Sequence, residues 1–231
     1  MHYYELEWTD DFKLMFEILT KFYVSMPSIL DDETPRLPII FDKLKDAYEN
    51  PFNKHKQALW FDRIKEPDQE VKLILELFDK YKFKHNIDYF TQSGHKDITG
   101  EFLPHRHMPG KVRRGVTDDG AAVDKVQTDA VGEKGTEIQT TNVQFTFPYI
   151  NSHLGETQWS ATYDVPFLER RRFTEEEITG RYTLNTKPVL FDVKSWHQGR
   201  NTTNNEDRVL FGIPTLFNNV KEAVKYLRRL Q

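Results

Sequence analysis

Cysteine is absent from this chain of 231 residues. Without a thiol the protein has no disulfide framework, no zinc–thiolate site and no cysteine nucleophile, and a reducing cytoplasm suits it. Long apolar runs are missing as well. No stretch approaches the roughly 20 apolar residues that cross a bilayer, and the acidic opening MHYYELEWTDDFKLMF does not fit a signal peptide. We therefore expect a cytoplasmic protein without a membrane span.

A strong charge of one sign is also lacking, because 32 basic residues face 36 acidic ones and the net charge is −4. This balance gives no electrostatic reason to expect a nucleic-acid or membrane-surface partner. The chain is rich instead in aromatic side chains, at 13% of residues, and each of these buries a large area in a core. Length and composition together predict a single folded domain over residues 1–231.

Helical spacing of apolar residues dominates the first third of the sequence. One such segment follows Thr9, a second covers residues 38–49, and a third opens at Asp68. We expect residues 1–85 to form a helical buttress. Residues 215–231 should carry a C-terminal helix.

After residue 85 the sequence changes to short β-branched and aromatic runs separated by turn residues. Several short strands at this spacing are typical of a sandwich or barrel, which makes residues 86–214 the core of the fold. Within it, residues 111–140 are rich in glycine and charge and predict either a lid or an excursion with weak hairpin structure. The expected strands cover residues 87–92, 97–104, 141–149, 157–164, 181–184, 188–194 and 207–213.

Two histidines stand two residues apart in LPHRHMPG. If the segment is extended, alternation puts the imidazoles of His105 and His107 on one face of the strand, where they can share a metal. An H-x-H pair by itself is a weak signal, since two polar residues at a strand end give the same pattern. The pair is therefore a candidate metal site that depends on a further ligand.

A third histidine and an arginine flank a polar stretch near the C-terminus. We expect His197 to end the apolar strand that contains Val189, and Arg208 to begin the next apolar strand. An arginine at the start of a buried strand costs free energy unless it is paired, and its guanidinium is suited to a bidentate grip on a carboxylate. A surface ion pair is the alternative reading of Arg208.

A distal histidine followed about eleven residues later by an arginine, each beside an apolar strand, resembles the signature of the Fe(II)/2-oxoglutarate-dependent oxygenases. The resemblance covers roughly residues 98–214 and implies a mostly β fold, a double-stranded β-helix (jelly roll) buttressed by N-terminal helices. It further implies that His105 and His197 bind Fe(II) and that Arg208 binds 2-oxoglutarate. The implied activity is hydroxylation of a small-molecule or protein side-chain substrate.

The sequence departs from that family at one ligand. Where the family has Asp or Glu, this chain has His107, so the implied iron site consists of three histidines and carries one negative charge fewer. It should hold Fe(II) more weakly. Asp118 or Asp119 of the long loop could supply a carboxylate instead, although nothing in the sequence fixes their position.

Two alternatives remain open. Three-histidine dioxygenases of the cupin type also use H-x-H and a later histidine, and here Gly100 precedes the pair while Asn201 follows His197. The Arg208 strand favours the oxygenase resemblance over the cupin one. The other alternative is a degenerate jelly roll with a binding or structural role and no turnover. The sequence leaves the oligomeric state undetermined.

Overall fold

The fold was derived from a computed structural model. It describes residues 1–22, 46–49, 56–92, 104–106, 113–116, 122–125, 141–165, 169, 171–201 and 208–230.

The larger of two main sheets contains seven strands. They are β1 (Tyr3–Glu5), β2 (Tyr48–Glu49), β3 (Lys56–Trp60), β4 (Asn86–Gln92), β7 (Val143–Ile150), β10 (Val189–Asp192) and β12 (Arg208–Pro214). Their order is β1-β10-β7-β12-β4-β3-β2, and every neighbouring pair is antiparallel. The last strand of the chain, β12, therefore lies between two much earlier strands, β4 and β7.

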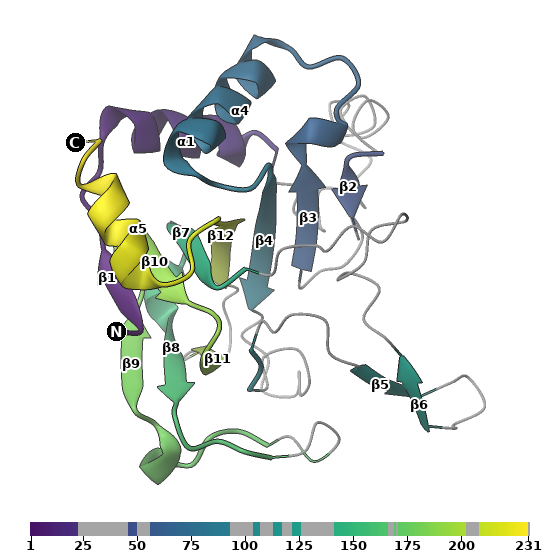
Figure 1. Ribbon diagram of the computed structural model, residues 1–231, viewed down its shortest axis with the longest axis vertical. Coiled ribbons are helices and arrows are strands. Elements are labelled where there is room, and N and C mark those ends of the chain that lie inside the picture. The colour runs from purple at the N-terminus through teal and green to yellow at the C-terminus, as the bar shows by residue number, and fades with distance from the viewer. Residues whose placement is uncertain are drawn as a thin grey trace.

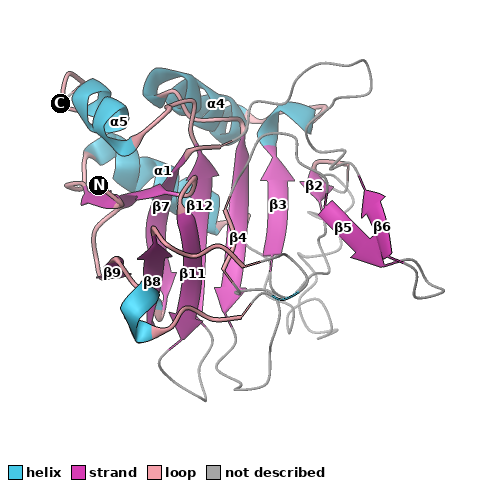
Figure 2. Cartoon of the chain, turned by 60° about the horizontal axis from the view of Figure 1, so that its bottom comes forward, coloured by secondary structure: helices cyan, strands magenta, loops and turns pink. Residues whose placement is uncertain are grey.

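The smaller sheet packs across the larger one (Figures 1 and 2). Its strands are β8 (Gly155–Ser160), β9 (Gly180–Thr183) and β11 (Trp196–Asn201), in the order β11-β8-β9. On the free side of β11, His105 forms an antiparallel bridge with His197. From β4 onward the chain thus crosses between the sheets. In the larger sheet the strands of this part have the order β4-β12-β7-β10. In the smaller sheet the order is β11-β8-β9, with His105 beside β11. This closure of the last strand against the first is the Greek-key arrangement of a jelly roll, as expected.

Helices cover the outer face of the larger sheet, as Figure 1 shows. They are α1 (Asp10–Thr20), α4 (Gln69–Tyr81) and α5 (Val220–Leu227). Phe12 and Phe78 of these helices belong to one buried cluster with Phe145, Phe147 and Phe211 of the sheet. Alternation along each strand sends the remaining side chains to the space between the sheets, where a second cluster forms. The short 3-10 helices are η1 (Phe61–Arg63), η3 (Ser152–Leu154) and η5 (Glu175–Glu177).

The N-terminal third is less helical than expected. The helices after Thr9 and Asp68 are present, and each begins where the predicted cap side chain accepts a backbone N–H. However, β1, β2 and β3 also lie within residues 1–85 and extend the larger sheet at both edges. The expected helix over 38–49 is wrong at its end, since Tyr48–Glu49 pairs with β3. Pairing with a neighbouring strand decides that these short segments form strands, and the periodicity of their own residues does not reveal that pairing.

Two boundaries near the candidate site also differ from expectation. The strand β10 ends at Asp192, whose carboxylate accepts hydrogen bonds from Lys194 N, Ser195 N and Ser195 Oγ. This side-chain turn redirects the chain, so His197 lies on a separate strand, β11, in the other sheet. The C-terminal helix begins at Val220, where the Asn219 side chain caps it.

Part of the long segment 111–140 forms a hairpin, which was one of the two structures expected there, the other being a lid. The strands β5 (Arg113–Val116) and β6 (Ala122–Lys125) pair with each other in an antiparallel manner. Asp118 and Asp119 lie outside the described residues, as does most of the expected strand 97–104. No helix within the described ranges is long and apolar enough to span a membrane.

Candidate functional site

His105 and His197 lie directly opposite each other on neighbouring strands. Their backbones exchange two hydrogen bonds of 2.9 Å, from His105 N to His197 O and from His197 N to His105 O. Their rings are tilted by 57° with centroids 4.2 Å apart. Residues opposite each other in an antiparallel pair point to the same side of the sheet. Two histidines separated by more than ninety positions therefore meet on one face.

That face is the interior of the jelly roll. On the other side of β11, His197 pairs with Trp159 of β8. Trp159 has no exposed surface and packs with Phe191 and Leu210 of the larger sheet. Because His197 and Trp159 are cross-strand neighbours, they face the same way. His197 is itself 8% exposed and lies inside the fold, and His105 beside it is half-buried.

The surroundings of His197 fix its protonation state. Burial lowers the pKa of His197 to about 4, so its imidazole is neutral at pH 7. Its Nδ1 lies 2.8 Å from Ser195 O, and a carbonyl oxygen can only accept, so Nδ1 carries the proton. The lone pair is then on Nε2. A ring oriented through Nδ1 by a backbone carbonyl is the usual arrangement of a metal-binding histidine.

Arg208, at the start of β12, points into the same interior from the larger sheet. It is completely buried, and its Nε donates a hydrogen bond of 2.9 Å to Ser152 O, just before the smaller sheet begins. Burial lowers the pKa of Arg208 to about 10, which still leaves the guanidinium charged at neutral pH. The alternative reading of Arg208 as a member of a surface ion pair is thus excluded, because the residue has no exposed surface. An enclosed permanent cation favours an anionic ligand.

Gly155 makes room for this arginine, and sequence reasoning missed it. A Cβ at this position would lie 2.5 Å from Arg200 O and 2.9 Å from Arg208 Nη1. Gly155 pairs with Asn201, four residues along β11 from His197, which corresponds to about 13 Å at ~3.3 Å per residue. The arginine therefore reaches the smaller sheet some distance along the same interior from the histidines. The sequence signal for this contact was the glycine itself, which follows residues 152–154 at the start of β8 and leaves space beside the strand.

The third expected ligand, His107, lies outside the described residues. Among the residues that are described, no group of three or more His, Asp or Glu side chains gathers where it could hold a metal. Of the other histidines, His85 pairs with Asp79 and His153 is exposed, as expected for surface residues. His2 is half-buried and stacks on Trp159, with ring centroids 5.5 Å apart.

The described residues fit a divalent transition metal in part. Nitrogens that share such a metal at ~2.0–2.1 Å lie within about 4 Å of each other, which rings with centroids 4.2 Å apart can meet. The neutral His197 imidazole has the tautomer that a metal requires. Two ligands are present, and a residue two positions after His105 in an extended chain would face the same side.

Comparisons with known proteins complete the description. No protein-family model matches the sequence, and no curated protein matches it significantly. Similar solved structures include HygX from Streptomyces hygroscopicus with nickel and 2-oxoglutarate bound, at 10% identity and a TM-score of 0.41, covering 93% of this chain and 82% of that one. A structure of prolyl 4-hydroxylases from Phytophthora capsici has 13% identity and a TM-score of 0.35, and the match covers 98% of this chain and 77% of that one. The Fe(II)/α-ketoglutarate-dependent dioxygenase TqaL has 7% identity and a TM-score of 0.31, and the match covers 89% of this chain and 88% of that one. At these scores the likenesses assign no function, and the jelly roll rests on the strand order.

Proposed function

We propose that this protein is an Fe(II)/2-oxoglutarate-dependent oxygenase that hydroxylates a small molecule or a protein side chain. The observation that carries the proposal is the pairing of His105 and His197 inside the jelly roll, with His197 Nδ1 held by Ser195 O. In the proposed site His105, His107 and His197 hold Fe(II), and Arg208 binds the far carboxylate of 2-oxoglutarate. Together these two groups would supply the oxygen-activating chemistry when bound.

The residues of the chain provide the environment for that chemistry. Ser195 O orients the His197 ring, and Ser152 O orients the Arg208 side chain. The histidines and the arginine are separated along the interior, so a dicarboxylate bound to the metal at one end would place its other end toward Arg208. Trp159 and its apolar neighbours exclude water from the adjoining interior, which strengthens electrostatic interactions there.

Binding of the metal is the first test. Anaerobic equilibrium dialysis with Fe(II) should show binding by the wild type and a loss of at least about tenfold for His105→Ala and for His197→Ala. His85→Ala is the matched control, because His85 pairs with Asp79 at the surface, and it should bind Fe(II) as the wild type does. Equal binding by all variants would refute the histidine assignment.

Binding of 2-oxoglutarate tests the arginine separately. For the Fe(II)-loaded protein, Arg208→Ala should weaken 2-oxoglutarate binding by hundreds-fold, since losing one buried charged partner costs ~3–5 kcal/mol. It should leave Fe(II) binding intact. Arg200→Ala, with an exposed side chain on β11, is the control. Calorimetry that shows equal affinities for wild type and Arg208→Ala would overturn the assignment.

Turnover tests the role of His107. Succinate release with Fe(II) and 2-oxoglutarate should increase in His107→Asp, because an anionic ligand restores the negative charge that the three-histidine site lacks. An inactive wild type, together with a variant that changes neither turnover nor Fe(II) affinity, would remove His107 from the metal site. The alternative would then be a jelly roll that binds ligands without turnover.

A further inference from the structure

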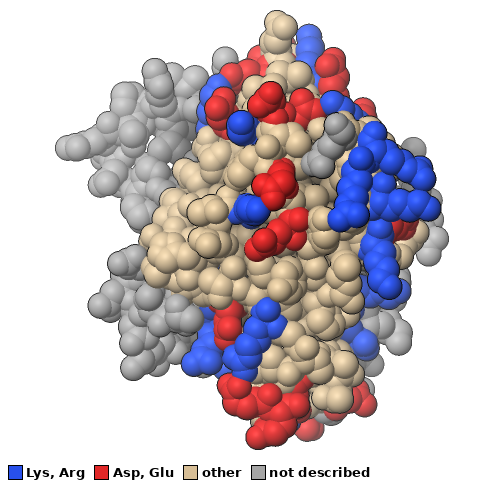
Figure 3. Space-filling view, turned by 90° about the vertical axis from the view of Figure 1, so that its left-hand side faces the viewer, with Lys and Arg blue, Asp and Glu red and all other residues tan. Residues whose placement is uncertain are grey.

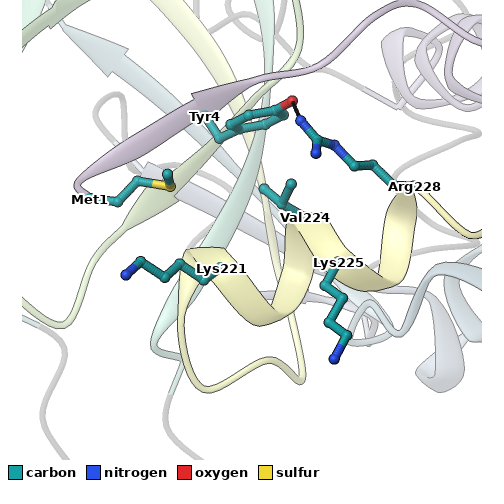
Figure 4. A pocket seen from close by; sticks show the side chains of 6 residues that line it. All are labelled: Met1, Tyr4, Lys221, Val224, Lys225 and Arg228. Atoms are coloured by element: carbon teal, nitrogen blue, oxygen red, sulfur yellow. Dashed lines mark hydrogen bonds between the residues drawn. The ribbon is translucent and has the colours of Figure 1, made fainter.

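A groove with a volume of about 420 Å³ lies between α5 and the edge strand β1, outside the jelly-roll interior. Figure 4 shows the side chains that line it. Its lining divides into three cations and three residues with apolar surface. These are Lys221, Lys225 and Arg228 of α5, together with Met1, Tyr4 and Val224. Among the described residues, no acidic side chain lines the groove.

The three cations have no acidic partners in the part of the chain that the structure describes. Every ion pair found there involves other residues. Arg228 instead contacts Tyr4, with Nη2 donating a 2.6 Å hydrogen bond to the phenol oxygen and the guanidinium 5.4 Å from the ring centroid. Figure 3, which views the side of the molecule that carries β1 and α5, shows lysines and arginines gathered along one edge.

The helix dipole favours Lys225 and Arg228, which lie in the last turn and at the C-cap of α5, but it does not explain Lys221. Lys221 is the second residue of the helix, where the positive end of the helix dipole disfavours a cation. Lys221 and Lys225 are four residues apart on one face, a spacing at which like charges repel. Both effects destabilise the free helix, and a bound anion would relieve both. Lys221 and its spacing from Lys225 are therefore better explained by a ligand than by folding.

The distribution of charge identifies the kind of ligand. Lys221 and Arg228 are seven residues apart, which is about 10 Å along the helix axis. In Figure 4 the amino groups of Lys221 and Lys225 point in different directions. A single phosphate group needs donors that converge on it, whereas this row matches separate charges spaced along a chain. Met1 is 64% exposed and offers apolar surface in the groove, whereas Val224 is buried in the core.

We propose that this groove docks an acidic peptide segment of a partner protein. The carboxylates of the segment lie along Lys221, Lys225 and Arg228, and one apolar side chain packs on Met1. This docking depends on neither the metal nor 2-oxoglutarate, so it stands or fails independently of the proposed oxygenase activity.

The test is fluorescence anisotropy with a labelled peptide of alternating Asp and Glu around one central Leu. The whole chain should bind it at low ionic strength, and high salt should weaken the binding because the charges are exposed. The double charge reversal Lys221→Glu/Lys225→Glu should raise the dissociation constant by at least about tenfold. The matched control Lys13→Glu/Lys72→Glu makes the same change in net charge at two exposed positions on α1 and α4, and should retain binding within about twofold.

Two further arms decide between ligands, and circular dichroism verifies that each variant is folded. Replacing the central Leu of the peptide by Ser should weaken binding at least about threefold, because the apolar contact with Met1 is lost. An equal loss in both double variants would show an effect of global charge only and overturn the proposal. Tripolyphosphate or anionic vesicles that bind more tightly than the peptide, with the same dependence on Lys221 and Lys225, would also overturn it.

Discussion

Arg208 is a cation enclosed between two sheets, and two of the neighbours of its side chain have a definable part in keeping it there. Ser152 O accepts from its Nε. Gly155 leaves the space that its Cδ and Nη1 occupy, since a Cβ would come within 2.9 Å of Nη1 and 3.0 Å of Cδ. The position of the guanidinium therefore depends on the absence of a side chain at residue 155.

Gly155→Ala is expected to destabilise the protein and disturb the arginine. The backbone oxygen of Arg200 would be 2.5 Å from the new Cβ and cannot move independently of β11, so overpacking should cost ~1–3 kcal/mol. Urea unfolding measures the change. Thr183→Ala, at an exposed position on β9, should leave the free energy of unfolding within ~0.5 kcal/mol of the wild type. If Gly155→Ala were as stable as this control, the close approach of Arg208 to residue 155 would be wrong.

His197 predicts a dependence of stability on pH. Its pKa is 6.5 when exposed and about 4 when buried in the fold. Between these values the unfolded state binds more protons than the folded state, so the free energy of unfolding falls as the pH falls from about 6.5 to about 4. At 1.36 kcal/mol per pKa unit, acidification from pH 7 to pH 5 should cost about 2 kcal/mol from this group.

The measurement compares metal-free wild type with His197→Gln by urea unfolding at both pH values. The variant lacks the titrating ring, so it should lose about 2 kcal/mol less than the wild type over this range. Other groups titrate equally in both proteins and cancel in the difference. Identical pH dependence in the two proteins would mean that His197 is accessible to protons in the folded state.

At the scale of elements, capping side chains decide where the helices and strands begin and end. Asp68 accepts from Val71 N at 2.9 Å and starts α4, while Asn219 starts α5. Asp192 and Ser160 act in the same way at strand ends, since their side chains accept from backbone N–H groups of the following turns. The turn at Asp192 matters most for function, because it sends the chain to the smaller sheet just before His197.

Asp68→Ala should destabilise the protein by about 1 kcal/mol, because the N–H of Val71 loses its acceptor at the start of α4. Asp68→Asn is the matched control, since asparagine caps helices about as well as aspartate. Thermal and urea unfolding of the two variants provide the comparison. Equal losses in both would point to the charge of Asp68 rather than to its hydrogen bond. Fe(II) binding should be unchanged in both, because α4 lies on the outer face of the larger sheet.

For the whole molecule, the proposed ligands would connect the two sheets. His105 and His197 belong to the smaller sheet and Arg208 to the larger one. A metal and a dicarboxylate bound between them can form their contacts only while both sheets are packed together. Binding should therefore stabilise the entire jelly roll rather than one element.

Calorimetric unfolding should consequently show a higher Tm with a divalent metal and 2-oxoglutarate together. A ligand at 100 times its dissociation constant adds about 2.7 kcal/mol, and each kcal/mol raises the Tm of a chain of this size by ~2–4 °C. The expected shift is about 5–10 °C, and succinate of equal concentration with EDTA serves as the control for ionic effects. A Tm unaffected by both ligands would contradict a site shared by the sheets.

Particular residues show what sequence reasoning could reach. The apolar stripes after Thr9 and Asp68 and the alternating strands are local patterns, and they predicted α1, α4 and most strands of a β-sandwich or barrel, whereas the jelly roll was implied by the family resemblance. The resemblance of the His197 and Arg208 spacing to a known signature singled out residues that the structure places in the interior. The strands β1, β2, β3 and β11 were missed because each is stabilised by its partner strands rather than by a pattern of its own.

The sequence by itself determined which residues can form helices and strands and which side chains can bind a metal or a carboxylate, because those properties are local. Only the tertiary structure decided that His105 pairs with His197 and that Arg208 reaches across to Gly155. Pairing between strands far apart in the chain depends on which faces are buried together, and no single strand carries that information. Burial then gives His197 its lowered pKa and Arg208 its enclosed charge.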